Sequence, residues 1–104
     1  MDKNFFQKVY DVVKLIPKGY VSTYGQIAKF IGQPTMSRQV GWALHKNPYP
    51  IEVPCHRVVF SDGSLSPAFA FGGLNRQFEL LQNENVEFLD NGKVNMKKHL
   101  YKFI

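Results

Sequence analysis

Three prolines stand within seven residues near the centre of the chain, at positions 48, 50 and 54, and they lead directly to Cys55, the single cysteine. Proline fixes its own φ, lacks a backbone N–H and clashes with the preceding helical turn, so no regular helix can cross this stretch. The same restriction holds the backbone still on the approach to Cys55. Such an approach suits a side chain that must be fixed in a pocket.

Before the prolines, apolar residues recur at helical spacing. The first set predicts a helix over residues 5–16, which Pro17-Lys18-Gly19 ends. Thr23 stands three residues before Gln26, a capping-box pattern that predicts a second helix up to Gly32. A third helix is expected from Met36 to Lys46, with its apolar residues on one face.

The second and third helices are joined by a turn containing glycine and proline, which predicts a helix-turn-helix. The third helix carries polar and basic side chains on its outer faces, and such a helix can enter a DNA groove. The alternative is an ordinary corner of a small helical bundle, in which Trp42 is a partly buried core residue.

After the prolines, the elements are shorter. A buried strand is predicted over residues 58–60, and a turn over residues 61–63. The turn leads to a small apolar loop over residues 66–73. Leu74, Phe78 and Leu81 share one face of a further helix, with Glu84 near its end. A β-hairpin is predicted from residues 86–89 and 94–96. The basic residues 97–102 are expected to form a solvent-exposed end of the chain. We therefore expect one domain over 1–104, mainly α and winged-helix-like, with small β elements.

The charge balance favours a polyanionic partner. Lys and Arg total 13 against 8 Asp and Glu, which gives a net charge of +5 and a pI near 9.4. Such a balance is typical of a small domain that meets nucleic acid, although a solvated basic surface without a partner is the alternative. We find no apolar run long enough for a membrane span and no secretory signal, so we expect a cytoplasmic protein with no membrane partner.

Cys55 is followed directly by His56. A thiol with a pKa of about 8.5 needs a base or a positive neighbour to become a strong nucleophile at neutral pH, and histidine can supply it. Adjacent side chains often point apart, however, and a free cysteine is often an inert core residue. One cysteine forms no internal disulfide and no thiolate cluster, so we expect no metal and no cofactor.

Further runs of residues carry a resemblance. The run Pro54-Cys55-His56-Arg57-Val58-Val59 follows Asn47-Pro48 and Ser37-Arg38-Gln39-Val40-Gly41-Trp42-Ala43. Three further runs occur in the same order as in the family that the chain resembles: Val21-Ser22-Thr23-Tyr24-Gly25-Gln26-Ile27-Ala28, Gly72-Gly73, and Leu80-Leu81 followed by Glu84. The chain thus closely resembles the C-terminal DNA-binding and active-site domain of the O6-alkylguanine-DNA alkyltransferases, over about residues 5–88.

The resemblance implies a role for each matching residue. Cys55 is the acceptor thiol, His56 its base through a water, and Glu84 the carboxylate that orients the imidazole. Asn47 holds the active-site turn, and Tyr24 lies near the flipped guanine, where its hydroxyl stabilises charge on the leaving purine.

The DNA contacts that the resemblance implies lie on the helix-turn-helix. Arg38 fills the gap left in the base stack, from a helix lying in the minor groove. The other expected DNA-binding residues are Ser37, Gln39, Thr23 and Lys46, together with Tyr24. The expected partner is duplex DNA containing O6-alkylguanine, bound by a monomer.

The chain also departs from the transferase pattern. Gln77 stands where the resemblance leads us to expect lysine, and Ala68-Phe69-Ala70-Phe71 replaces a stretch with tyrosine, in a loop about two residues longer. These features resemble the alkyltransferase-like proteins, which bind O6-alkylguanine and flag it for nucleotide excision repair. Those proteins usually lack the cysteine, which is present here. Three functions therefore stay open: a suicide alkyltransferase, a non-catalytic lesion sensor with excision-repair partners, and a DNA-binding module with an inert Cys55.

Overall fold

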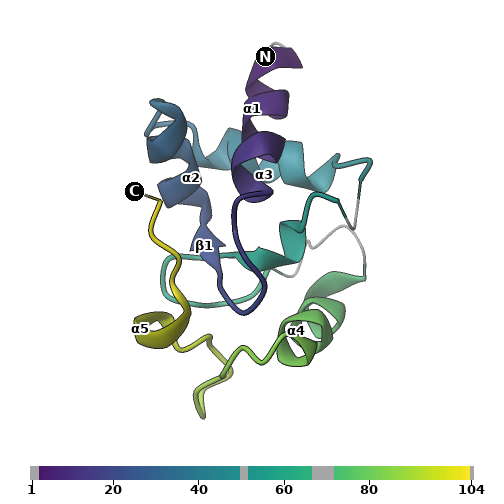
Figure 1. Cartoon of the computed structure of the whole chain (residues 1–104), viewed down its shortest axis with the longest axis vertical. Coiled ribbons are helices and arrows are strands. Elements are labelled where there is room, and N and C mark those ends of the chain that lie inside the picture. The colour runs from purple at the N-terminus through teal and green to yellow at the C-terminus, as the bar shows by residue number, and fades with distance from the viewer. Residues whose placement is uncertain (1–2, 50–51, 67–71, 104) are drawn as a thin grey trace.

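Three helices form the N-terminal half of the protein. The computed structural model describes residues 3–49, 52–66 and 72–103, and it places α1 (Lys3–Val13), α2 (Tyr24–Ile31) and α3 (Ser37–His45) in mutual contact (Figure 1). All three expected helices are confirmed, although the first ends at Val13 and leaves Ile16, still fully buried, in the turn that follows. The main core lies between these helices and consists of Phe5, Val9, Tyr10, Val12, Val13, Ile16, Ile27, Ala28, Val40, Ala43, Leu44, Val53, Cys55 and Val58.

The ends of α2 follow the local sequence signals. The Thr23 side chain accepts a hydrogen bond from the Gln26 backbone N–H at 3.1 Å, and Gly32 closes the helix in the left-handed region at φ 90°. The capping box is only half formed. The Gln26 side chain instead donates to the Tyr101 carbonyl at 2.7 Å and contacts the Ser22 hydroxyl at 3.1 Å, so it ties α2 to the C-terminal segment.

A two-stranded parallel sheet joins the two halves of the molecule. β1 (Ser22–Thr23) pairs with β2 (Val58–Val59), Ser22 opposite Val58, and Val21 forms a further parallel bridge with Leu100. In Figure 1 β1 lies between the upper helices and the lower half that contains α4 and α5. The expected strand is thus confirmed at two of its three residues. Phe60 lies outside it and is 43% exposed, because the chain turns back there toward Ser64.

The C-terminal half contains α4 (Gly73–Asn83), α5 (Met96–His99) and a second core of Val21, Val59, Leu81, Val86 and Val94. The expected apolar face of α4 is partly wrong. Leu74 is exposed, and the fully buried positions are Leu81 and Gln77, a residue that an apolar pattern cannot reveal. The expected hairpin is reduced to one antiparallel bridge between Phe88 and Val94, since α5 begins at Met96.

The prediction of a solvated basic tail is also wrong in part. Lys97, Lys98 and Lys102 are exposed, but His99 is buried. Its Nδ1 donates to the Gly19 carbonyl at 2.8 Å, and its Nε2 accepts from the Glu87 N–H at 2.9 Å. Because both ring nitrogens find backbone partners, burying the imidazole carries no unmet hydrogen bond. No helix among the described residues is long and apolar enough to span a membrane.

Candidate active site

Cys55 lies at the start of a single 3-10 turn, residues Cys55–Arg57, which we call the nucleophile turn. Pro54 precedes it with φ −77° and ψ 69°, and the Cys55 N–H donates to the Val53 carbonyl at 2.7 Å. These are the dihedrals and the hydrogen bond of an inverse γ-turn. Since the proline ring already restricts φ to this region, Pro54 positions the backbone of Cys55 at little further entropic cost.

Asn47 closes the loop that leads to this turn. Its buried side chain donates from Nδ2 to the carbonyls of Tyr49 (3.2 Å) and Val53 (3.1 Å), and its Oδ1 accepts from the Tyr49 N–H at 2.8 Å. Burial raises the pKa of Cys55, and the Asn47 side chain opposes that effect without cancelling it. Cys55 is therefore a neutral thiol at pH 7 until a base removes its proton.

His56 and Glu84 form a largely buried pair. His56 Nε2 lies 2.9 Å from Glu84 Oε2, and burial lowers the pKa of His56 even though the bond to Glu84 acts in the opposite direction. The imidazole is therefore neutral at pH 7. With the Nε2 hydrogen directed at the carboxylate, Nδ1 is the ring nitrogen able to accept a proton.

Arg57 completes this cluster, and sequence reasoning gave it no role. Its guanidinium donates to both carboxylate oxygens of Glu84, from Nε at 2.9 Å and from Nη2 at 2.8 Å, and from Nη1 to the Ile16 carbonyl at 2.8 Å. Burial alone would raise the pKa of Glu84, but the bonds from Arg57 and His56 outweigh it and lower that pKa. Glu84 is therefore ionised beside His56. No local signal could reveal this contact, because 27 residues separate the partners.

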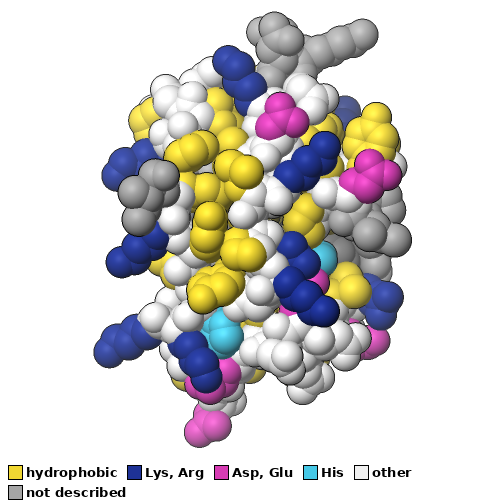
Figure 2. All heavy atoms as spheres, in the orientation of Figure 1, with side chains coloured by type: hydrophobic (Ala, Val, Ile, Leu, Met, Phe, Trp, Pro, Cys, Tyr) yellow, Lys and Arg dark blue, Asp and Glu magenta, His cyan; other side chains and the backbone are white. Residues whose placement is uncertain are grey.

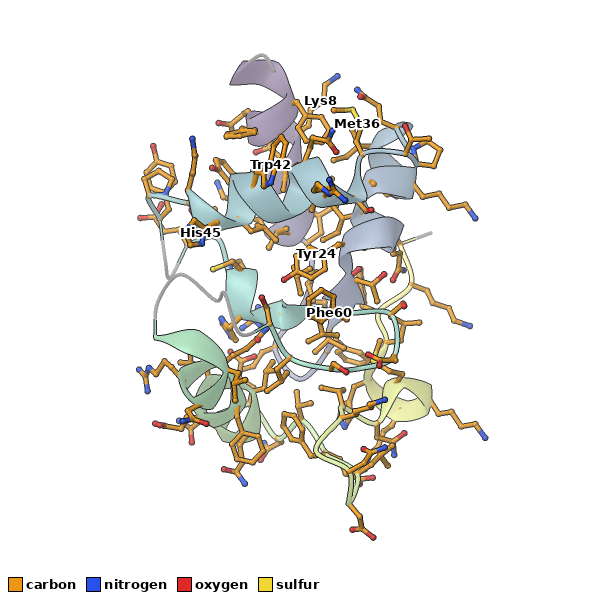
Figure 3. The ribbon with its side chains drawn as sticks, turned by 180° about the vertical axis from the view of Figure 1, so that it is seen from behind. Lys8, Tyr24, Met36, Trp42, His45 and Phe60 are labelled. Carbon is orange, nitrogen blue, oxygen red and sulfur yellow. The ribbon has the colours of Figure 1, made fainter. Side chains whose placement is uncertain are left out.

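Cys55 opens onto a cavity of about 700 Å³ between α2, α3 and the loop after β2. Tyr24 and Phe60 face each other there with ring centroids 5.4 Å apart, and Figure 3 shows the two rings close together beside α3. Burial raises the pKa of Tyr24, and a hydrogen bond with the Ser66 side chain partly offsets the effect. The lining residues are Tyr24, Gly25, Ser37, Arg38, Gly41, Trp42, Leu44, His45, Cys55, Phe60, Ser61 and Ser66.

Some of the expected DNA-binding residues line the cavity, and others do not. Ser37 and Arg38 line it, and Arg38 is exposed. Thr23 uses its side chain to cap α2, and Lys46 is exposed at the end of α3. Gln39 is half-buried, and its Oε1 has no hydrogen-bond partner among the described residues. Trp42 and His45 line the cavity without having been singled out as DNA-binding residues. The residues Ala68–Phe71 lie outside the described residues.

The distribution of Lys and Arg side chains over the surface does not by itself identify the functional site. Figure 2 shows Lys and Arg on both sides of a band of hydrophobic side chains, on the face opposite the one seen in Figure 3. Within the described ranges, no group of three or more His, Cys, Asp or Glu side chains could hold a metal ion. The cavity with Cys55 in its lining is thus the best-defined candidate site.

The comparison with known families agrees with this geometry. The family model for the DNA-binding domain of 6-O-methylguanine DNA methyltransferase matches residues 4–86, a range that holds Cys55, His56 and Glu84. The chain belongs to this family. The match confirms the resemblance seen in the sequence.

Relatives of two kinds share the family. The chain is 43% identical over 103 residues to alkyltransferase-like protein 1 of Schizosaccharomyces pombe, and the match covers 94% of each chain. It is 38% identical over 98 residues to the methylated-DNA–protein-cysteine methyltransferase of Haemophilus influenzae, covering 94% of this chain and 54% of the relative. The crystal structure of S. pombe Atl1 with damaged DNA containing O6-carboxymethylguanine superimposes with a TM-score of 0.85 at 38% identity, over 99% of each chain. The mainly helical fold with small β elements is thereby confirmed.

Proposed function

We propose that the protein binds duplex DNA, takes a flipped O6-alkylguanine into the cavity and transfers the alkyl group irreversibly to Cys55. The observation that carries the proposal is that one turn brings a thiol to the cavity lining and, beside it, a histidine paired with an ionised carboxylate. A volume of about 700 Å³ lies within the usual range of sites for small ligands. The structure of S. pombe Atl1 with O6-carboxymethylguanine DNA supports the same ligand class.

The chemistry follows from the protonation states. His56 accepts the thiol proton through a water, and Glu84 stabilises the imidazolium that forms. The Cys55 sulfur then attacks the alkyl carbon, a C–S bond forms, and the bond from that carbon to O6 of guanine breaks with its electrons passing to the purine. A hydrogen bond from the Tyr24 hydroxyl stabilises the purine anion, which takes up a proton to give guanine. The thioether is stable, so each molecule reacts once.

The deciding experiment is incubation with a duplex containing O6-methylguanine, followed by mass spectrometry of the Cys55 peptide. We expect a mass increase of one methylene on Cys55, and the Cys55→Ser variant should bind the lesion without taking up the methyl. Glu84→Gln should slow the transfer, because it removes the charge that stabilises the imidazolium. Wild-type protein that binds tightly and leaves the methyl in place for hours would exclude the transferase.

Arg38 tests the base-flipping part of the proposal. Arg38→Ala should weaken binding to a lesion-containing duplex more than to an intact one, because the guanidinium is proposed to replace the extruded base. Lys46→Ala is the matched control. It should weaken both complexes alike and lower the slope of the salt dependence by about one, as expected for a lost phosphate contact. Equal losses in Arg38→Ala would reject its role.

The second candidate is a lesion sensor that recruits nucleotide excision repair. The observation in its favour is the extent of the matches, since the alkyltransferase-like protein of S. pombe matches over almost its whole length and the transferase of H. influenzae over about half. In a sensor, Cys55 would be a structural residue of the cavity wall. The unmodified Cys55 peptide, together with tight lesion binding, would identify this function.

A further inference from the structure

Gln77 is a fully buried amide near the centre of α4, and it bonds to segments that flank the candidate site. Its Nε2 donates two hydrogen bonds, to the carbonyls of His56 and Val58, both at 3.0 Å. Its Oε1 accepts from the Ser66 N–H at 2.9 Å. Both amide hydrogens and the amide oxygen are thus used, each on the backbone of a different residue.

The three partners belong to two separate segments beside the cavity, which we call its two walls. His56 and Val58 are in and directly after the nucleophile turn, which holds Cys55. Ser66 lines the cavity, as Tyr24 does, and the Ser66 side chain opposes the rise in the pKa of Tyr24 that burial causes. We call Tyr24 and Ser66 the tyrosine wall. Gln77 is not among the residues that line the cavity, so any effect it has on a ligand passes through these two walls.

We propose that Gln77 is a positioning residue that fixes the separation between the tyrosine wall and the nucleophile turn, and thereby selects which O6-alkyl groups fit between them. The alkyl selection rests on the proposed function, whereas the coupling of the two walls does not. The carboxamide is planar and rigid, so atoms bound to its oxygen and to its nitrogen are held at one relative distance. The three bonded backbone groups depend on Gln77, because buried polar groups without a partner are costly.

Glutamine at position 77 has the donors and the acceptor that are needed to bond to both walls. Lysine, which the sequence resemblance leads us to expect here, has three donors and no acceptor when charged. It could bond the two carbonyls of the nucleophile turn but could not accept from the Ser66 N–H. Methionine is similar in length to glutamine, but it can neither donate to the carbonyls of the nucleophile turn nor accept a strong hydrogen bond from the Ser66 N–H. Gln77 therefore links both walls in a way that neither of these residues can.

The first test uses the protein without DNA. In Gln77→Met, NMR titration with labelled tyrosine and histidine rings should show two changes, each of at least about 0.5 unit. The pKa of Tyr24 should rise further, because loss of the Ser66 bond removes an influence that lowers it. The pKa of His56 should move up toward its ordinary value, because a looser turn admits water and weakens the desolvation that lowers it.

Gln26→Met is the matched control. Gln26 is also a glutamine that binds a distant carbonyl, that of Tyr101, but it does not line the cavity. We expect it to lose stability without changing either titration. Should Gln77→Met fail to fold, Gln77→Asn replaces it, since its amide is one methylene shorter and cannot reach both walls. Unchanged titrations in a folded Gln77 variant, or a change at only one wall, would overturn the proposal.

The second test measures selectivity. Dissociation constants for duplexes with O6-methylguanine and O6-benzylguanine should give a ratio that changes at least about threefold in Gln77→Met and stays constant in Gln26→Met. An unchanged ratio in both variants would refute the selection of alkyl groups. If the wild-type protein binds neither duplex, the proposed function fails, while the two titrations still decide whether Gln77 couples the walls.

Discussion

The nucleophile turn and the C-terminal segment, residues 96–103, are both held by buried or half-buried polar side chains that bond to backbone groups. Asn47 and Gln77 hold the region of the nucleophile turn, and Gln26 and His99 hold the C-terminal segment. The difference lies in the charges. The nucleophile turn is next to a largely buried, ionised Arg57–Glu84 pair, whereas the C-terminal segment keeps its ion pair, Lys98 with Glu87, exposed.

The difference between a largely buried and an exposed ion pair indicates different roles for the two regions. Exposed ion pairs contribute little to stability, and neutral buried groups suffice to pin a segment to the fold. A buried ion pair is costly to form and frequently brings no net stability. Its presence beside His56 therefore fits a chemical requirement, namely a fixed negative charge that stabilises the imidazolium. Each of the following predictions tests one side of this comparison.

The largest effect is expected at Arg57. Arg57→Met leaves the Glu84 carboxylate buried without its cation, and loss of one partner of a buried pair costs about 3–5 kcal/mol. Urea unfolding measures the change. The control is Arg76→Met, which breaks an exposed pair with Glu79 and should cost less than about 1 kcal/mol. Similar small losses in both variants would contradict the importance assigned to the buried pair.

His99 should give the next largest effect. His99→Phe leaves the Glu87 N–H and the Gly19 carbonyl without their partner, at a cost of about 1–3 kcal/mol. Amide exchange should accelerate at Val21 and Tyr101, whose N–H groups bond across the same segment. Lys97→Ala, on the exposed side of α5, should leave both the unfolding midpoint and the exchange unchanged. Unaltered exchange in His99→Phe would show that other contacts hold the segment.

A smaller, pH-dependent effect is expected from His56. Its pKa is lowered in the folded protein, so between that pKa and the ordinary value of about 6.5 the unfolded chain binds more protons. The free energy of unfolding should therefore fall as the pH drops from 7 toward 5, and it should fall less in His56→Gln. Below about pH 4.5, protonation of Glu84 adds a further loss, because its folded pKa is also lowered. Parallel curves for the two proteins would refute the assignment to His56.

The smallest effect is expected at the exposed pair of the C-terminal segment. Lys98→Ala removes a contact with Glu87 in which both side chains are largely exposed. The urea midpoint should stay within experimental error of the wild type, at low and at high salt. A clear loss at low salt would mean that this segment also depends on charge, and the contrast between the two regions would disappear.

Local patterns were enough to predict the three N-terminal helices and the fixed approach to Cys55. Helical spacing predicted α1, α2 and α3, and Thr23 and Gly32 marked the ends of α2 correctly, because capping depends on residues three or four apart. The prolines before Cys55 predicted an irregular, fixed approach, and Pro54 does set the turn. The resemblance to the alkyltransferases predicted the family, which is confirmed, and it named Cys55, His56 and Glu84 as a set, of which the structure pairs His56 with Glu84.

Sequence patterns failed where the partner is remote. They assigned no role to Arg57, took the Gln77 position only as a departure from the transferases, and described the tail as solvated although His99 is buried. The parallel pairing of β1 with β2 was likewise not expected.

The sequence by itself determined the N-terminal helices, the caps of α2 and the proline-restricted turn, since each of these depends on neighbours within about one helical turn. Only the tertiary structure decided which polar side chains are buried and what they bind. A buried amide, guanidinium or imidazole is tolerated only where donors and acceptors from distant segments meet it, and those segments come together only when the chain folds.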